Sequence, residues 1–166
     1  MKTHLEVCRV SLALILALGC STAFAQAPAA PASGQAAGTL TVKGKAIKLA
    51  YASAFVDQED KGKQVILLVT EQPVPAADWK KHGDIMMYRM NKNPLLGVAF
   101  RLNDKRELVG ADFYDGDFPT STSGIFSVKL DSPPGKTFAG SAKSTEAAAK
   151  LTEPVSLSVS FNATLK

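Results

Sequence analysis

The residues from Val155 to Leu165 constrain the fold most strongly, because apolar and polar side chains alternate there without a break. The apolar set is Val155, Leu157, Val159, Phe161, Ala163 and Leu165, and the polar set is Ser156, Ser158, Ser160, Asn162 and Thr164. Period-two alternation is typical of a β-strand with one face on a core and the other in water. The rest of the chain must therefore supply the sheet that this strand joins.

Shorter alternating or apolar runs recur upstream and are separated by turn residues. They predict strands over 39–43, 45–56, 65–69, 85–90, 95–102, 107–114, 125–130 and 137–143. Turn signals between them include residues 61–63, 103–106, 115–116 and 132–135. Many short strands at regular spacing predict a mainly antiparallel, all-β domain. We expect a two-layer β-sandwich of eight or nine short strands, with a small β-barrel as the alternative.

Three segments refine this expectation. Residues 65–69 are apolar without alternation, which predicts a strand covered on both faces. Residues 72–83, with Pro75 near the start, and residues 144–151 predict one or two short helical turns. Over residues 45–56, strict alternation assigns Ile47, Leu49, Tyr51 and Phe55 to one face. It assigns Ala46, Lys48, Ala50, Ala52 and Ala54 to the other, which we expect to be an unremarkable exposed surface.

The first 25 residues have the pattern of a cleaved bacterial signal peptide. A short start carrying Lys2 and Arg9 precedes an apolar run over 10–19, and Ala23-Phe24-Ala25 fits a small-x-small cleavage site. The apolar run is too short to span a bilayer of about 30 Å. We therefore expect a periplasmic or secreted protein. The alternative is a lipoprotein anchored through Cys20.

Cleavage after Ala25 also sets the organisation of the exported chain. It removes Cys8 and Cys20, so we expect no disulfide. Residues 26–38 are Ala, Pro, Gly, Gln and Ser, a composition typical of a flexible linker. Residues 39–166 are enough for a single β-domain that relies on its own core.

Charge and hydropathy exclude two classes of partner. The net charge is +4 at pH 7, and it falls to +3 after cleavage because the signal peptide contains two basic residues and one acidic residue. The longest basic runs are pairs, such as Lys80-Lys81, whereas nucleic-acid-binding proteins carry a dense basic stripe. No apolar run is long enough to predict a membrane span. We therefore expect that the protein does not bind nucleic acid and has no membrane-spanning segment.

The sequence offers little support for catalysis. His82 is the single histidine beyond the leader, and no Gly-x-Ser-x-Gly motif accompanies it. Phosphate-binding glycine loops and zinc-ligand spacings are also missing from the sequence. We therefore expect a protein that is not an enzyme and that uses no cofactor.

One cluster suggests copper as an alternative. Trp79, His82, Met86, Met87 and Met90 lie within a short segment, and thioether and imidazole ligands without thiolate suit monovalent copper. On a strand, Met86 and Met90 would share a face but lie about 13 Å apart, and Met87 would face the other way. A single ion would need a bend or a ligand from another strand. The competing interpretation is that these methionines fill an irregular core beside the tryptophan.

Three carboxylates mark a second candidate site. Asp112, Asp115 and Asp117 flank Gly116, and together with Trp79 they are the candidate ligand-binding residues. Closely spaced carboxylates around a glycine are a feature of calcium loops, but the complete loop pattern is absent. A tight turn needs the same residue types, so a structural turn is the competing interpretation.

These observations predict an exported, non-enzymatic β-domain that serves as a binding or structural module of the bacterial cell envelope. The expected partner is an envelope protein or a polysaccharide. One alternative is a periplasmic copper-binding protein that uses His82 and the methionines. Another is an envelope inhibitor or adhesion module that contacts a protein through a loop or an edge strand. The hydroxyl face of residues 155–165 is a further candidate surface, unless it is only a solvated sheet face.

Overall fold

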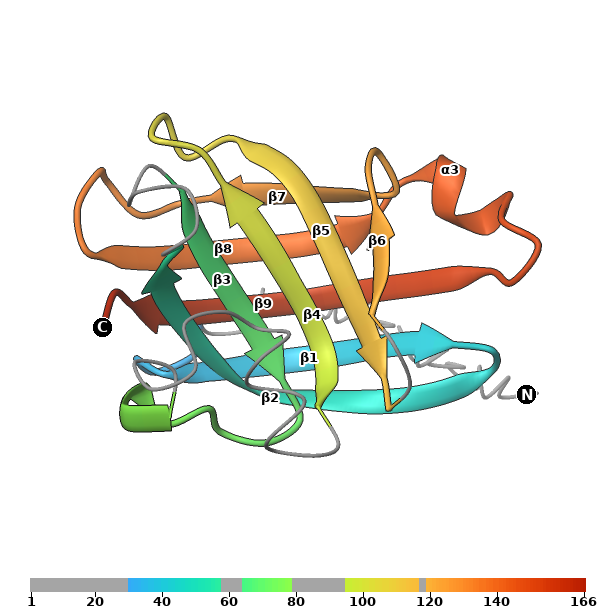
Figure 1. Cartoon of the computed structure of the whole chain (residues 1–166), viewed down its shortest axis with the longest axis horizontal. Helices are drawn as coiled ribbons and strands as arrows, with labels where there is room; N and C mark the ends of the chain where they lie inside the picture. The colour runs from blue at the N-terminus through green and yellow to red at the C-terminus, as the bar shows by residue number, and fades with distance from the viewer. Residues whose placement is uncertain (1–29, 58–63, 79–94, 117–118) are drawn as a thin grey trace, which may run out of the picture.

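The computed structural model describes residues 30–57, 64–78, 95–116 and 119–166 (Figure 1). Nine strands in these ranges form one antiparallel sheet, which confirms the all-β prediction. The strands are β1 (Gln35–Val42), β2 (Lys45–Val56), β3 (Val65–Thr70), β4 (Leu96–Leu102), β5 (Leu108–Asp115), β6 (Thr120–Thr122), β7 (Phe126–Leu130), β8 (Thr137–Ser144) and β9 (Val155–Thr164). Their order across the sheet is β6-β5-β4-β3-β2-β1-β9-β8-β7.

The sheet curls until its two halves face each other across a shared core. In Figure 1, β3, β4 and β5 run diagonally in front of β1, β9, β8 and β7. Strand β2 belongs to both halves, because residues 45–51 pair with β1 and residues 51–56 pair with β3. The architecture is a half-barrel whose halves act as the two expected layers.

Glycines without room for a side chain mark three points in this curled sheet. A Cβ at Gly38 of β1 would approach the Ser158 carbonyl of β9 closer than 3.0 Å. Gly97 of β4 and Gly140 of β8 are equally crowded against the backbone of their neighbouring strands. Glycine inside a strand often marks a bend or a close backbone approach, so these positions fit the tight curvature of the sheet.

The concave face holds the main hydrophobic core. The prediction for the last strand is confirmed, since β9 buries its apolar residues from Val155 to Ala163 and leaves the intervening polar ones at least partly exposed. Phe126 of β7 meets two rings of the opposite half, with centroid distances of 6.1 Å to Phe100 and 6.4 Å to Phe113. Both pairs are edge-to-face, the geometry that aromatic quadrupoles favour. The two halves are therefore joined by side-chain packing.

A second apolar cluster covers part of the convex face. Ile66 and Leu68 of β3 point away from the main core and pack with Phe55, Ala99 and Tyr114. Val74, from the segment after β3, lies over them and is 2% exposed. This arrangement confirms that residues 65–69 form a strand covered on both faces.

Strand β2 departs from the strict alternation that the sequence predicts. Ile47 and Leu49 point into the main core as expected, but Ala52 and Ala54 are also buried there and Phe55 lies in the second cluster. The pairing of β1 with β2 shifts between Gln35 and Gly38. The core-facing residues of β2 change from odd to even numbers near this irregularity, so the assignment of Ala52 and Ala54 to an exposed surface was wrong.

Other differences concern short elements. Strand β1 begins at Gln35, so the last four residues expected in the linker pair with β9 instead. Strand β6, which is not among the strands predicted from the sequence, pairs with residues 111–113 of β5. The predicted helical turns appear at residues 76–78 and in α3 (Glu146–Ala149). The expected signal peptide with Cys8 and Cys20, the first four residues of the linker, and the strand over 85–90 lie outside the described residues.

Arg106 fastens the turn after β4 to the turn after β7. Its guanidinium donates to the carbonyl oxygens of Pro133 and Thr137, at 2.5 and 2.6 Å, and to Ser132 Oγ at 3.1 Å. The same group stacks over the Phe138 ring, 4.5 Å from its centroid. The planar guanidinium group of arginine carries several donors and therefore suits such a junction. Arg106 thus holds the two halves of the sheet together at one end.

Candidate functional site

Most residues that the sequence singles out for metal binding cannot be placed. Trp79, His82, Met86, Met87 and Met90 all lie outside the described residues, as does Asp117. The copper alternative therefore stays a prediction from the sequence. Within ranges 30–57, 64–78, 95–116 and 119–166, no three His, Cys, Asp or Glu side chains gather closely enough to hold a metal ion.

The structure does not bring Asp112 and Asp115 together. They are three positions apart on β5, so their side chains leave opposite faces of the strand. Asp112 lies on the convex face and is 2% exposed, whereas Asp115 forms an ion pair with Lys43 at 3.3 Å. These two carboxylates do not face a common point, as a shared calcium ion would require.

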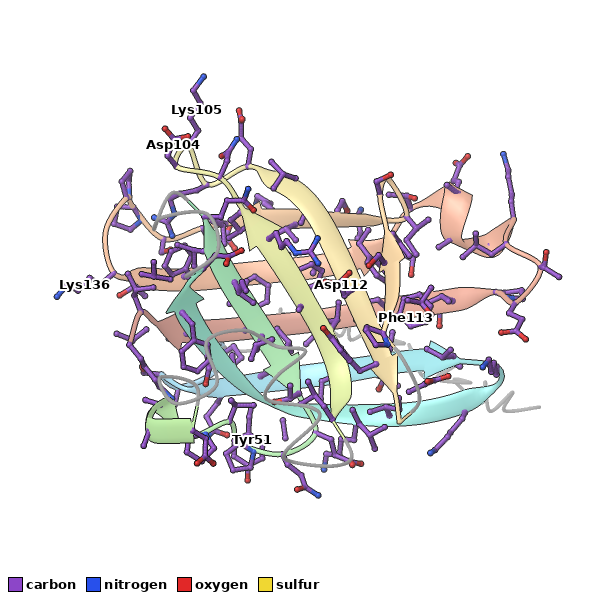
Figure 2. The ribbon with its side chains drawn as sticks, in the orientation of Figure 1. Tyr51, Asp104, Lys105, Asp112, Phe113 and Lys136 are labelled. Carbon is purple, nitrogen blue, oxygen red and sulfur yellow. The ribbon has the colours of Figure 1, made fainter. Side chains whose placement is uncertain are left out.

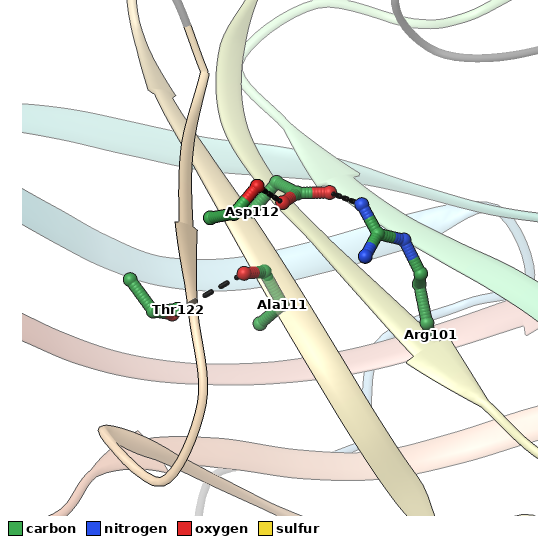
Figure 3. A network of polar contacts seen from close by, with 5 residues as sticks. Arg101, Ala111, Asp112 and Thr122 are labelled. Atoms are coloured by element: carbon green, nitrogen blue, oxygen red, sulfur yellow. Dashed lines mark hydrogen bonds and ion pairs between the residues drawn. The ribbon is translucent and has the colours of Figure 1, made fainter.

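Asp112 belongs to a polar network across three strands (Figure 3). One carboxylate oxygen accepts a hydrogen bond and ion pair from Arg101 Nη2 of β4, and the other accepts from Ser121 Oγ of β6 at 2.5 Å. Thr122 Oγ1 donates to the Ala111 carbonyl beside it, at 3.2 Å. A buried carboxylate requires such partners, so this network anchors the short β6 to β5.

We predict that removing the cation of this network destabilises the fold. Arg101→Met leaves the Asp112 carboxylate buried without its ion pair and should lower the free energy of unfolding by about 2–4 kcal/mol. The value lies below the full cost of a buried charge because the Arg101 side chain is 38% exposed and water can partly replace it. Urea unfolding of Arg101→Met and of the double variant Arg101→Met/Asp112→Leu checks this. Equal stability of the wild type and Arg101→Met would contradict it.

A groove opens where the two ends of the curled sheet fail to meet. We call it the seam groove, with a volume of about 340 Å³. One wall is residues 108–111 of β5, the other is residues 126–128 of β7, and residues 122–124 form the rim. Its floor is apolar and its rim carries hydroxyl groups. Ligand sites commonly combine these features at volumes of about 300–1,000 Å³.

Both walls of the seam groove are strand edges. Strand β6 pairs with residues 111–113 of β5 only, and β7 is the last strand of the sheet. The pairing of β4 with β5 shifts at Val109, which is the extra residue of a β-bulge. Val109 is consequently 50% exposed, although it is a large apolar residue. Bulges near sheet edges often redirect a side chain in this way.

The structure has a second groove. It has a volume of about 560 Å³ and lies between the β1–β2 turn and the segment that joins α3 to β9. Lys43 of this turn already binds Asp115 and, at 3.8 Å, Glu153. These charges satisfy one another, so this groove offers a ligand less than the seam groove does.

Sequence reasoning missed the seam groove and the Arg101 partner of Asp112. The groove is formed by residues from two segments that share no motif, and only the curl of the sheet brings them together. The partner could have been sought on the strand that pairs with β5, since Arg101 and Asp112 belong to one predicted hairpin.

Comparisons with known proteins supply no relative from which a function could be transferred: no family model, curated protein or solved structure matches the chain. In the described part of the chain, no helix is long and apolar enough to cross a membrane.

Proposed function

We propose that this protein is an exported, non-enzymatic binding module of the bacterial cell envelope, and that its seam groove holds an extended peptide strand of an envelope partner. The observation that carries the proposal is the exposed Val109, at a bulge on one of two strand edges that face each other across an apolar floor. Export is supported by the signal-peptide pattern of residues 1–25.

The walls suit a peptide because each is a strand edge that lacks a neighbour over part of its length. An extended peptide gains main-chain hydrogen bonds when it adds to such an edge, and its alternate side chains enter pockets. Gly110 and Gly124 leave open space beside the backbone at the groove. A Cβ added at Gly110 would contact only Arg101 Nη1, at 3.6 Å, and a Cβ added at Gly124 would have no atom within 4 Å. Val109 and the ring of Phe126 would pack against the apolar side chains of the peptide.

We predict that a carboxylate at Val109 weakens this binding without unfolding the protein. The test is an array of overlapping 12-residue peptides from periplasmic and outer-membrane proteins, probed with the purified protein. Val109→Asp should lower the affinity for the captured peptides by about tenfold or more, because a charge replaces an apolar contact worth roughly 1.5 kcal/mol. Leu151→Asp is the matched control, since Leu151 is also an exposed apolar residue, 38% exposed, and does not line the groove.

Hydrogen exchange locates the bound peptide. A captured peptide should slow amide exchange in residues 108–110 and 127–130, because added-strand hydrogen bonds protect the edges that form them. An array without binding, or peptides that bind the wild type and Val109→Asp equally, would refute the proposal.

A further inference from the structure

We infer that the convex face of β2, β1, β9, β8 and β7 is a docking surface for an anionic polysaccharide. This lysine–hydroxyl face is separate from the seam groove, and the inference does not depend on the peptide proposed there. It rests on how the strand register arranges lysines and hydroxyl groups in rows.

One row crosses all five strands. The register aligns Lys48 of β2 with Thr39 of β1, Thr39 with Ser158 of β9, Ser158 with Lys143 of β8, and Lys143 with Ser127 of β7. A parallel row aligns Ser160, Ser141 and Lys129. Side chains that are directly opposite on neighbouring strands share a face, so these groups form a continuous array.

The charge on this face is of one sign. Lys48, Lys143 and Lys129 lie on it, and strands β2, β1, β9, β8 and β7 contain neither Asp nor Glu. Lys48 and Lys143 are exposed and form no ion pair with any side chain of the described ranges, whereas Lys129 pairs with Asp131 at 3.1 Å. These two lysines are separated by three strand spacings, each of about 4.8 Å, and Thr39 and Ser158 lie between them. An uncompensated row of this kind is complementary to a ligand with repeated negative charges.

The chemistry between the lysines favours a saccharide over other polyanions. Hydroxyl groups of Thr39 and Ser158 can both donate and accept, which matches the hydroxyl groups of a sugar chain. The two aligned rows contain no aromatic or arginine side chain to stack on nucleic acid bases, and the half-buried Tyr51 of β2 lies beyond them on the same face. The rows also have no large apolar side chain to enter a bilayer, because the large exposed hydrophobic residues of the described ranges are Val56, Val109 and Leu151.

The test measures binding of the purified protein to polygalacturonate, with neutral dextran and phosphatidylglycerol vesicles as comparison probes. We expect polygalacturonate to bind, dextran not to bind, and the affinity to fall as salt rises from 50 to 500 mM, because salt screens exposed charges. Lys48→Gln/Lys143→Gln should weaken binding to polygalacturonate at least tenfold, and Lys48→Arg/Lys143→Arg should largely retain it.

The control variant is Lys105→Gln/Lys136→Gln, which removes the same charge from two hairpin tips (Figure 2). It should change the affinity less than twofold if the lysine–hydroxyl face is the site. Equal losses in the two glutamine variants would show that only net charge matters and would overturn the inference. Stronger lysine-dependent binding to the vesicles would overturn it in favour of a lipid surface.

Discussion

Phe126→Ala is expected to lower the free energy of unfolding by about 3–5 kcal/mol, the range typical of large-to-small substitution of a buried aromatic side chain. Phe126 is 4% exposed and is the residue of β7 that meets Phe100 and Phe113 of the opposite half. Its removal takes away apolar burial and leaves a cavity beside the seam groove. Domains of this size have roughly 5–15 kcal/mol of stability in total, so the loss is a large share.

Denaturation in urea measures this effect, with Phe126→Leu as the control. The leucine variant keeps most of the apolar volume and should lose less than about 1.5 kcal/mol. The midpoint should fall in the alanine variant while the slope of free energy against urea stays unchanged, since the unfolded surface area is the same. A loss below about 1 kcal/mol for Phe126→Ala would show that β7 does not share the core of β4 and β5.

The strand elements were largely predictable because their signals are local. Alternation from Val155 to Leu165 needs no partner to be recognised, and β9 adopts it with every apolar residue from Val155 to Ala163 buried. The uninterrupted apolar run of β3 likewise predicts coverage on both faces, which Val74 provides on the convex side. Such patterns reflect the pleat of a single strand and the environment of its two faces.

Features that depend on register could not be predicted in this way. The faces of β2 exchange beyond the shift in its pairing with β1, and no residue within β2 signals that shift. Thr120–Thr122 form a strand by pairing with residues 111–113 of β5, and the side chains of Ser121 and Thr122 add hydrogen bonds to Asp112 and Ala111. A three-residue polar segment carries no periodicity of its own.

The candidate sites show the same division. Asp112 was selected as a ligand residue because the sequence reveals its charge, but not that Arg101 and Ser121 use that charge. The seam groove and the lysine–hydroxyl face are products of how distant strands are arranged. Residues such as Lys48 and Lys143 become neighbours in one row only once the strand order places two strands between them.

Gly140→Ala is expected to destabilise the protein by more than about 3 kcal/mol, or to prevent folding, although it adds a single methyl group. A Cβ at this position would approach the Lys129 carbonyl of β7 closer than 3.0 Å, and the obstacle is backbone that cannot rotate away. Overpacking of a well-packed site typically costs about 1–3 kcal/mol and more where the backbone must move. The methyl group would push β7 away from β8 and so change the wall of the seam groove.

Gly110→Ala is the matched control, because it makes the same change on another strand of the same sheet. Its Cβ would meet only Arg101 Nη1, at 3.6 Å, which is ordinary van der Waals contact. Alanine there also restricts the unfolded chain, so the stability should stay within about 1 kcal/mol of the wild type. Thermal and urea unfolding of both variants decide the matter. If Gly140→Ala is as stable as Gly110→Ala, then β7 and β8 can separate without loss, and the tight curl that forms the seam does not depend on a bare backbone at residue 140.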